Sequence, residues 1–521
     1  MRAPKKAPKK TSKKTSKKTS KKAATKTPKK RSGQRIAPPV ISARLNSHIA
    51  LEGRADGSIV ACFDDHSVSL GKFSAGVMDR AANLRTGLPL ASFASDSRNA
   101  DPEIDLLVRQ LARRGLLEYR LGHLGDDQDQ VVIEPQVSDY WPRTPKRGVA
   151  ETVVLSRFAY LRRRGNEMVL ESPRAGALFR ICDPKIAAAL AMLSKPQKIS
   201  RFRRQDGFPG SELLALLLDC QILFSVDAAS GDGLRSDEGG DNFVVWDFHD
   251  LLFHTHSTEG RQANPLGGLY PHAGVISPPP AVRAPWPGKA IDLGKFSDAP
   301  SQAHSAVATL LRERHSTRDF DDRQPITLVE LARFLDSTAR VQAKWKSELD
   351  FGEGGPEIEY AARPYPSGGS AYELELYLAV ANCEGLARGF YHYDADRHAL
   401  VPIAAGSHEL EAMLTSAEFA MDAPAPPQIL ITIAARFGRV AWKYSSIAYA
   451  LILKDVGVLI QTFYMMATEM GLGGCAIGSN NIDLFEKITG IEFHVEGPVG
   501  QFAIGRGRPP EAADQRPDGP D

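Results

Sequence analysis

The stretch that decides the fold is RFGRVAWKYSSIAYALILKDVGVLIQTFYMMATEMGLGGCAIG, residues 436–478. It places a Lys443-Tyr444 pair beside a long apolar helix that ends in a glycine turn. Burying a lysine ammonium is costly and lowers its pKa, so a buried lysine beside a phenol is a candidate proton acceptor. Taken alone, the pair is more typical of a snorkelling lysine and an interfacial tyrosine at a helix start.

The same apolar helix is not expected to cross a membrane. Lys454 and Asp455 interrupt its run over residues 447–470, so we predict a core helix and no membrane insertion. The 5 cysteines are scattered and form no CxxC pair. This argues against a disulfide framework and a zinc ribbon, and it indicates a reducing, cytoplasmic location.

Charge divides the chain into a basic tail and an acidic body. The first 35 residues carry 13 Lys and 3 Arg and no acid, so with +3 for the whole chain the remainder carries −13. Residues 1–35 repeat TSKK over 11–22 and have almost no apolar side chains, which predicts a disordered segment. Polybasic tails contact polyanions by counterion release, and a solvated tail without a partner is an equal alternative.

Two blocks after the tail share one order of predicted elements. In residues 36–140, Asp101 and Pro102 begin a helix that runs into the strand LLEYRLG. In residues 141–230, a helix beginning at Ser211 runs into the strand QILFSVD. This succession is typical of the step from the last helix of a winged helix to its wing. We therefore predict two winged-helix-like α+β modules, with one unduplicated α+β domain as the alternative.

The C-terminal half is predicted to be a separate domain. Residues 231–299 combine a linker rich in Gly, Asp, Ser and Pro with the histidine-containing segment 246–261. Residues 300–510 mix helices and strands without a regular βαβ alternation, which favours an α+β fold over a Rossmann fold. Residues 511–521 form a short tail.

Three segments of this domain have compositions that suit a bound cofactor. LLRERHSTRDF (310–320) gathers guanidiniums and a hydroxyl that suit a phosphate, although on its own it is more typical of a solvated basic turn. PSGG (366–369) and GLGG (471–474) place small residues where a flat ring can approach backbone amides, with simple turns as the alternative. The histidines of 249–256 have a spacing that a metal could use, but we predict no metal site.

In this order, and ahead of a final GRG (505–507), the three segments resemble the FMN-binding nitroreductase superfamily. More narrowly, the chain resembles the SagB-type dehydrogenases, the oxidases of azole-containing peptide biosynthesis. WDFHDLLFHTHSTEGR (246–261), the central PSGG and the Lys-Tyr pair carry this resemblance, which covers residues 242–507. Where the family pattern commonly has a Tyr-Pro pair after the central glycines, this chain has Ala371-Tyr372-Glu373.

The resemblance implies a nitroreductase-like FMN fold, with a central, mostly antiparallel sheet flanked by helices. It also implies a homodimer whose two FMN molecules lie at the subunit interface. The residues expected at the FMN phosphate and ribityl chain are Arg314, His315, Ser316 and Arg318, with Arg506 as a further phosphate candidate. Those expected to border the isoalloxazine are Ser367, Gly368, Gly369, Gly473 and Gly474.

The implied activity is the oxidation of thiazoline or oxazoline rings in a ribosomal precursor peptide to aromatic azoles. One hydrogen leaves as hydride to flavin N5, and the other is acidic because its carbon adjoins a ring nitrogen and a carbonyl. We predict Lys443 as the base and Tyr444 as the residue that orients it or shares the proton, if burial lowers the lysine pKa. Oxygen as re-oxidant, a cyclodehydratase partner and peptide recognition by the N-terminal modules are also implied.

Two other functions fit the same sequence. A generic NAD(P)H-dependent nitroreductase would share the fold, and bleaching of a bound flavin by NADPH would favour it. A non-catalytic scaffold that binds peptide or nucleic acid through its N-terminal half would contain no flavin. In that half, Arg113, Arg114 and residues 162–164 are the only compact basic patches of an otherwise acidic body, so we favour peptide over DNA.

Overall fold

The structure is a computed structural model. It describes residues 39–63, 66–93, 101–123, 128–145, 148, 151–202, 208–226, 238, 241–261, 267–294, 305–349 and 355–508. The predictions for the Lys-rich tail, for the linker at 227–237 and for residues 511–521 lie outside the described residues.

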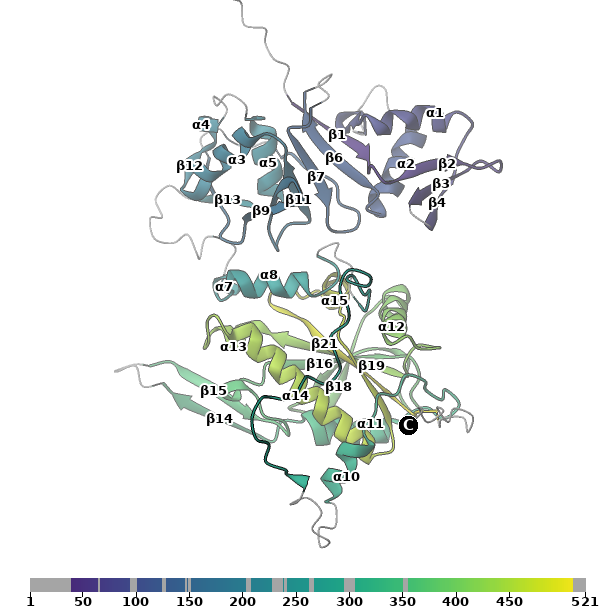
Figure 1. The fold of residues 1–521 in the computed structure, drawn as a ribbon, viewed down its shortest axis with the longest axis vertical. Coiled ribbons are helices and arrows are strands. Elements are labelled where there is room, and N and C mark those ends of the chain that lie inside the picture. The colour runs from purple at the N-terminus through teal and green to yellow at the C-terminus, as the bar shows by residue number, and fades with distance from the viewer. Residues whose placement is uncertain are drawn as a thin grey trace, which may run out of the picture. The chain divides into compact units, whose positions relative to one another are not determined.

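The N-terminal half contains one order of elements twice (Figure 1). Each repeat has a strand, a three-stranded meander, a helix with a 3-10 turn, a short strand with a short helix, a longer helix and a final strand. The first repeat is β1 (Val40–Leu45), β2 (Ala50–Gly53), β3 (Ser58–Phe63), β4 (His66–Lys72), α1 (Val77–Ala81), η1 (Ala82–Arg85), β5 (Leu88–Pro89), η2 (Leu90–Phe93), α2 (Pro102–Arg113) and β6 (Leu117–Gly122). The second is β8 (Thr152–Leu155), β9 (Tyr160–Arg164), β10 (Glu167–Glu171), β11 (Ala177–Ile181), α3 (Pro184–Ala191), η3 (Met192–Ser194), β12 (Gln197–Lys198), α4 (Ile199–Phe202), α5 (Ser211–Asp219) and β13 (Leu223–Val226). The same order of elements thus occurs twice along the N-terminal half.

One strand between the modules joins them into a single sheet. β7 (Val131–Pro135) pairs antiparallel with β6 of the first module and with β11 of the second. The resulting seven-stranded sheet has the order β5-β1-β6-β7-β11-β10-β9. β4 is the strand of the first module that corresponds to β11, and it lies at the edge of the separate sheet β2-β3-β4. β7 pairs with one edge of β11, and among the described residues no strand pairs with the corresponding edge of β4.

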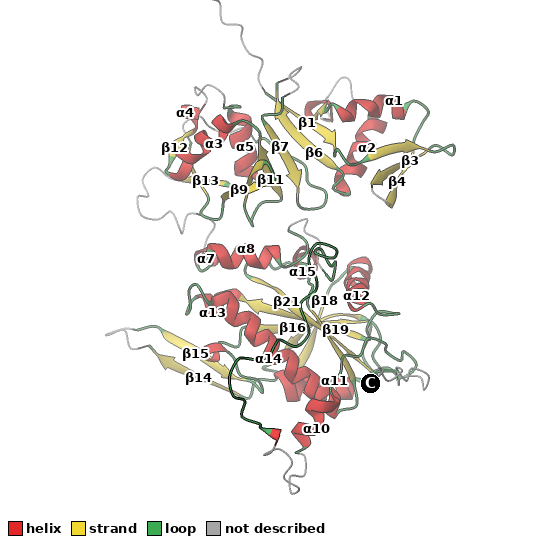
Figure 2. Ribbon diagram, in the orientation of Figure 1, coloured by secondary structure: helices red, strands yellow, loops and turns green. Residues whose placement is uncertain are grey.

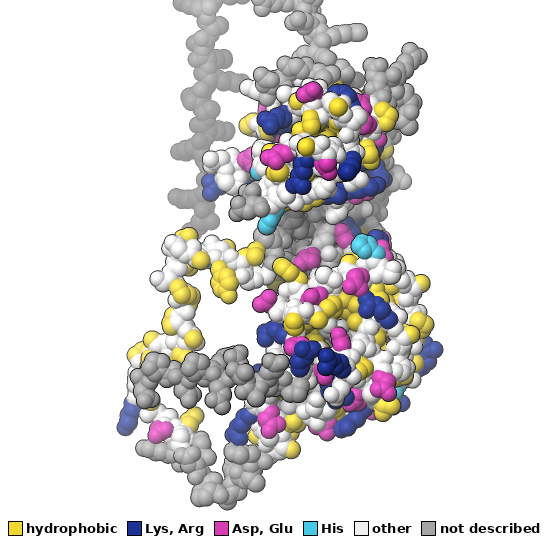
Figure 3. Space-filling model, turned by 90° about the vertical axis from the view of Figure 1, so that its right-hand side faces the viewer, with side chains coloured by type: hydrophobic (Ala, Val, Ile, Leu, Met, Phe, Trp, Pro, Cys, Tyr) yellow, Lys and Arg dark blue, Asp and Glu magenta, His cyan; other side chains and the backbone are white. Residues whose placement is uncertain are grey.

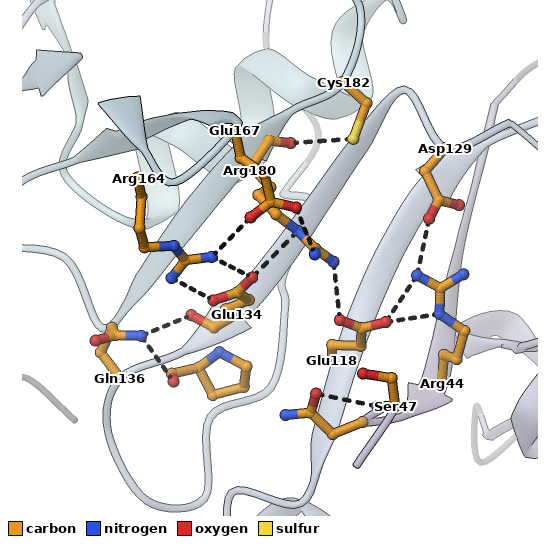
Figure 4. A network of polar contacts seen from close by, with 12 residues as sticks. Arg44, Ser47, Glu118, Asp129, Glu134, Gln136, Arg164, Glu167, Arg180 and Cys182 are labelled. Carbon is orange, nitrogen blue, oxygen red and sulfur yellow. Dashed lines mark hydrogen bonds and ion pairs between the residues drawn. The ribbon is translucent and has the colours of Figure 1, made fainter. Parts of the chain in front are cut away.

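The two faces of the seven-stranded sheet differ in chemistry. Alternate residues of a strand point to opposite faces, and one set builds an apolar core with α2, α3 and α5. The other face carries a lattice of ion pairs, in which Arg180 contacts both Glu118 and Glu134 (Figure 4). Arg164 pairs with Glu134 at 2.8 Å, and Arg162 pairs with Glu171 at 2.8 Å. Two of the three arginines at 162–164 are therefore neutralised within the fold.

The C-terminal domain is a six-stranded antiparallel sheet between two layers of helices (Figure 2). The strand order is β18-β17-β16-β19-β21-β20, as expected for a mostly antiparallel sheet flanked by helices. Its elements are α7 (Asp241–Val244), α8 (Phe248–His256), α10 (Ala306–Glu313), α11 (Leu328–Ala339), β14 (Ala343–Glu348), β15 (Glu357–Ala362), η4 (Gly368–Ser370), β16 (Leu374–Val380), β17 (Gly389–Asp394), β18 (Ala399–Ile403), α12 (Ser407–Met421), β19 (Ile429–Arg436), α13 (Phe437–Ala441), α14 (Ala448–Glu469), β20 (Gly473–Ile477), α15 (Ile482–Thr489) and β21 (Glu496–Gly505).

Strand alternation divides the side chains of this sheet between two cores. Leu376, Ile433 and Phe502 pack with α11, α13 and α14 on one face. Tyr377 and Ala434 pack with α12 and α15 on the other. Each face thus buries one stripe of a helix layer, the usual arrangement of a layered α+β domain.

The long helix α14 is the central element of its layer. By length and apolar composition it could cross a membrane, yet Ile452, Leu459 and Phe463 are buried in the domain core. It contacts α8, α11, α13, β20 and β21. One side of the helix packs into the domain core, and its two ends hold the candidate site.

Candidate functional site

Two pockets lie at opposite ends of α14, and they have no lining residue in common. A helix of 22 residues is about 33 Å long. We call the pocket at its C-terminal end the arginine pocket and the pocket at its N-terminal end the lysine pocket. The residues predicted for one cofactor are divided between these two places.

The arginine pocket has a volume of about 610 Å³. It is lined by the loop after α10, by the last turns of α14 and by the turn that leads into β20. The predicted residues that line it are His315, Arg318, Gly473 and Gly474. Arg314 and Arg318 form no ion pair with a carboxylate among the residues that the structure describes. Unpaired guanidiniums beside a hydroxyl are a donor set that suits a phosphate.

Tyr464, which the sequence analysis did not single out, organises this pocket. Its hydroxyl lies 2.8 Å from Ser316 Oγ and accepts a hydrogen bond from Ala476 N at 2.8 Å. The Arg314 guanidinium lies over its ring, 5.1 Å from the centroid. Tyr464 therefore connects the basic loop, α14 and β20. In the sequence it is one residue of a long apolar helix. The only sign of its role is its position about two turns before the glycine turn at Gly471.

The glycines of this pocket have packing roles. Gly471 has a φ of +66°, and the bonds Gly471 N to Thr468 O and Leu472 N to Ala467 O end α14 as predicted. A Cβ on Gly473 would lie 2.6 Å from Thr317 Cγ2, and a Cβ on Gly474 would overlap the ring of Phe502. The two glycines thus allow the basic loop and β21 to approach β20 closely. Whether they also border a flavin stays a prediction.

Arg506 does not line the arginine pocket. Its guanidinium pairs with Glu330 at 2.6 Å, and Glu330 closes a capping box with Thr327 at the start of α11. Arg508 lines the pocket instead, 3.6 Å from Asp319. The geometry thus favours Arg508 over Arg506 as the C-terminal phosphate candidate.

The lysine pocket has a volume of about 440 Å³. It is lined by β15, by the turn Gly369–Ala371 and by residues of α13 and the segment that follows, including Arg439, Trp442 and Lys443. Its turn has left-handed backbone at Gly369 (φ 62°), Ser370 (φ 55°) and Tyr372 (φ 43°). Such conformations are costly outside glycine and occur mainly at functional sites.

Lys443 and Tyr444 close on this turn. Lys443 Nζ donates to the Gly369 carbonyl at 3.2 Å. A Cβ on Gly369 would overlap the Tyr444 hydroxyl and lie 2.7 Å from Lys443 Nζ. Glycine is therefore required here both by its φ and by the pair that packs on it.

The expectation that Lys443 is buried is wrong for a single chain. Its side chain is exposed, and Trp442 beside it is 55% exposed. We expected desolvation to make this lysine a base at neutral pH, and a single protomer does not provide that desolvation. Any burial of Lys443 has to come from a molecule that covers the lysine pocket.

Two acidic residues that the sequence analysis did not assign hold the other half of the turn. Asp455 Oδ2 accepts hydrogen bonds from Ser367 Oγ and Gly368 N, each at 2.8 Å. Ser367 Oγ also lies 3.3 Å from Glu373 Oε2. Burial, together with the charge of Asp455, raises the pKa of Glu373 to about 7. In the sequence, Asp455 stands out as a carboxylate within an apolar helix, but this feature alone argues only against a membrane span.

The segment Trp246–Arg261 anchors the lysine end of α14. Trp246 Nε1 donates to His494 O at 2.8 Å, and His254 Nδ1 lies 3.1 Å from the Tyr449 hydroxyl. Complete burial lowers the pKa of His254 to about 3, so this ring is neutral. Among the described residues, no group of three His, Cys, Asp or Glu side chains is placed to hold a metal ion.

Two family profiles match the chain. Residues 311–506 match the nitroreductase family, and residues 153–263 match the cyanobactin oxidase ThcOx family. The first match contains both ends of α14. The second runs from β8 of the second module through α8 of the anchoring segment.

Two curated relatives are similar to parts of this chain. The nitroreductase-family protein MJ1384 of Methanocaldococcus jannaschii is 30% identical over 199 residues, 38% of this chain and 89% of that protein. The microcin B17-processing protein McbC of Escherichia coli is 28% identical over 122 residues, 22% of this chain and 44% of McbC. The match to McbC thus spans less than half of that protein.

Solved structures show more distant likeness. A chain of the E. coli microcin synthetase McbBCD complex with truncated pro-MccB17 bound aligns with a TM-score of 0.37 at 17% identity, over 55% of this chain and 100% of that one. A nitroreductase-like protein of Ralstonia eutropha aligns with a TM-score of 0.30 at 21% identity, over 44% of this chain and 97% of that one. At these values neither structure bears on the function of this chain.

Proposed function

Since this chain belongs to the nitroreductase family, we propose that it is an FMN-dependent dehydrogenase that oxidises azoline rings of a ribosomal peptide to azoles. The observation that carries the proposal is the union, in one chain, of a nitroreductase-family domain with a segment of the ThcOx family. The likeness to McbC, a microcin-processing protein, supports the same class of substrate. The Lys443–Gly369 contact holds the proposed base at the lysine pocket.

We further propose that each active site is built from two chains. FMN held by its phosphate in the arginine pocket, with its ring near Gly473 and Gly474, is too short to reach Lys443 of the same chain along a helix of about 33 Å. The lysine pocket of a second copy can meet it there. Lys443 and Tyr444 of one protomer would then act on the flavin held by the other.

An uncovered apolar surface supports a second copy as the partner. Only 39% of the most apolar window of α14 is buried. α10, which contacts α14, has an apolar face but no buried residue, and its Val307 and Leu311 are exposed. An isologous interface along α14 and α10 would cover this surface and desolvate Lys443.

In the proposed mechanism, bound FMN supplies the acceptor for the hydride that leaves the azoline ring. Lys443 takes the more acidic proton of the ring, and the Gly369 carbonyl fixes the position of its Nζ. Tyr444, whose hydroxyl lies against Gly369, orients the ammonium or shares the proton. In this proposal the second copy covers Lys443 and removes it from water, the condition under which a lysine can act as a base.

The peptide substrate is proposed to dock on the N-terminal modules. β7 pairs with β11, whereas the equivalent strand β4 pairs only with β3 among the described residues, so an extended leader segment can add to β4 as a further strand. Acidic and basic side chains are interspersed on the face that Figure 3 shows. Because Arg162 and Arg164 are paired with carboxylates, the modules are poorly suited to a nucleic-acid backbone. A cyclodehydratase would supply the azoline-bearing peptide, and we place both enzymes in the cytoplasm.

The visible spectrum of the purified protein tests this proposal first. A flavin spectrum, followed by conversion of an azoline-bearing peptide to the azole with loss of two hydrogens, is the expected result. A protein without flavin contradicts the proposal. A flavin that NADPH bleaches, with no azole formed, would assign the chain to the generic nitroreductases instead.

A further inference from the structure

Two carboxyl groups lie buried behind the turn Ser367–Gly369, and the mechanism above uses neither of them. Glu373 is 0% exposed, and Asp455 on α14 is 7% exposed. An ionised carboxylate is costly to bury unless hydrogen-bond donors or cations compensate it. The donors around this Glu373–Asp455 pair therefore decide its charge.

The donors present suffice for one ionised carboxylate and not for two. Asp455 Oδ2 receives hydrogen bonds from Ser367 Oγ and Gly368 N. A serine hydroxyl has a single hydrogen, so Ser367 cannot at the same time serve Glu373 Oε2. Glu373 Oε1 is buried and has no hydrogen-bond partner among the described residues. If both groups were ionised, Glu373 would be a buried anion with no firm donor except its own backbone N–H, beside a second anion.

A proton on Glu373 removes this conflict. A neutral carboxyl group can donate to a neighbouring carboxylate, and the side chains of Glu373 and Asp455 are close enough to hydrogen-bond. The same surroundings shift the pKa of Glu373. Burial is the larger cause and the charge of Asp455 the smaller, and together they raise this pKa to about 7. Two interacting acids that share a site in this way titrate as a pair.

We propose that Glu373 and Asp455 share a single proton, and that this proton holds the Ser367–Gly369 turn in the position from which Gly369 binds Lys443. Loss of the proton places two negative charges behind the turn, and their repulsion opposes the bonds from Asp455 to Ser367 and Gly368. The pair acts through the turn, so both members are positioning residues. The proposal rests on the proposed function only where it concerns the flavin that this turn borders.

The charged and titratable groups that face the pair come from the elements packed around it. They are Tyr365 and Tyr372 on either side of the turn, Arg439 on α13, and Lys443 and Tyr444 after α13. Arg439 donates to the Ala371 carbonyl at 2.9 Å, and Lys443 is held at the Gly369 carbonyl. Neither cation forms a hydrogen bond or ion pair with a carboxylate of the pair among the described residues, and Arg439 acts on Glu373 only through its charge from a distance.

Unfolding at several pH values tests the shared proton without any need for the cofactor. A carboxyl group whose pKa is raised in the folded state stabilises that state below the unfolded pKa, and this stability is lost as pH rises through the folded value of about 7. Wild-type protein should therefore lose more stability between about pH 5 and about pH 8 than Glu373→Gln, whose amide donates to Asp455 at every pH. The control Glu411→Gln, an exposed carboxyl on α12, should keep the wild-type profile. Equal profiles for Glu373→Gln and wild type would overturn the proposal.

The reduction potential of bound FMN tests the effect on the site. Negative charge near a flavin disfavours its electron-rich reduced form, so between about pH 6 and about pH 8 the potential should fall more in wild type than in Glu373→Gln. Identical slopes would overturn the positioning role. If Glu373→Gln does not fold, Asp455→Asn serves instead, because it removes the neighbouring charge and its amide can donate to Glu373. The pKa of Glu373 should then lie below its wild-type value, although burial still raises it. A chain that binds no FMN would refute the proposed function, while the unfolding comparison would still decide the shared proton.

Discussion

The two ends of α14 are organised to very different degrees in a single chain. At the arginine end, Tyr464 already connects Ser316, Arg314 and β20 through short contacts. At the lysine end, the Ser367–Gly369 turn is tightly held by Asp455, yet Lys443 itself is exposed. The arginine pocket is thus already organised in one chain, whereas the proposed base at the lysine pocket is exposed and, in the function proposed above, is covered by a second chain.

The largest expected effect is at the lysine end. Lys443→Ala should lower azole formation by about 10²–10⁴-fold, the usual contribution of a general base, because no other lysine lines the pocket. FMN content should stay near wild type, since the phosphate is held at the other end of α14. Absorbance of bound flavin and mass loss of the peptide measure the two quantities. Lys487→Ala, an exposed lysine on α15, is the control, and normal turnover in Lys443→Ala would remove Lys443 from the mechanism.

A smaller effect is expected at the arginine end. Tyr464→Phe removes the hydroxyl that Ser316 and Ala476 share, and loss of such a hydrogen bond costs about 1–3 kcal/mol. FMN affinity, measured by fluorescence titration, should fall by about 10-fold. Turnover at saturating FMN should recover most of its wild-type value. Tyr391→Phe, whose hydroxyl bonds only locally to Ala387, should leave FMN affinity unchanged. Unchanged affinity in Tyr464→Phe would show that this end is not preformed.

The Gly369 turn should respond in stability and in turnover together. Gly369→Ala places a Cβ at φ 62° against Lys443 and Tyr444, and the left-handed backbone alone costs about 1–2 kcal/mol. Denaturant unfolding and steady-state kinetics should both show a loss. Gly268→Ala, at a position with open space around it, should be silent in both. A stable and fully active Gly369→Ala would mean that the turn does not position Lys443.

The smallest effect concerns the anchor of the lysine end. His254 is buried and bonds Tyr449 in the first turn of α14, and burial lowers its pKa to about 3. The unfolded chain therefore binds more protons between that value and its ordinary one, so stability should fall as pH drops below about 6.5. His254→Gln should flatten this decline. Hydrogen exchange should then show the first turn of α14 loosening in acid before the last turn does.

Much of the fold was predictable because its signals are local. The N-cap Asp101, the capping box of Thr327 and Glu330, and the C′ glycine Gly471 all depend on a few neighbouring residues. The hairpin β14–β15 was missed because every residue of β14 is exposed, so the alternation of Ala343 and Trp345 with lysines marks no buried face. The repeated module order was visible only as a succession of helix and strand.

The site was less predictable because it depends on tertiary contacts. Tyr464 and Asp455 appear in the sequence as ordinary positions of one apolar helix, and only folding brings them to Ser316 and Ser367. The prediction of a buried Lys443 failed for one chain because burial at that position needs a covering molecule. Local patterns cannot report which side of a helix another subunit covers.

Complementation between two inactive variants tests the two-chain site most directly. One variant carries Arg314→Ala with Arg318→Ala in the arginine pocket, and the other carries Lys443→Ala in the lysine pocket. After the subunits are mixed and exchanged, each mixed dimer has one site with both pockets intact, and random pairing predicts about a quarter of wild-type azole formation. If both pockets of a site came from the same chain, the mixture would be as inactive as its components. Azole formation that stays as low as in the two separate variants, despite proven subunit exchange, would contradict the two-chain site.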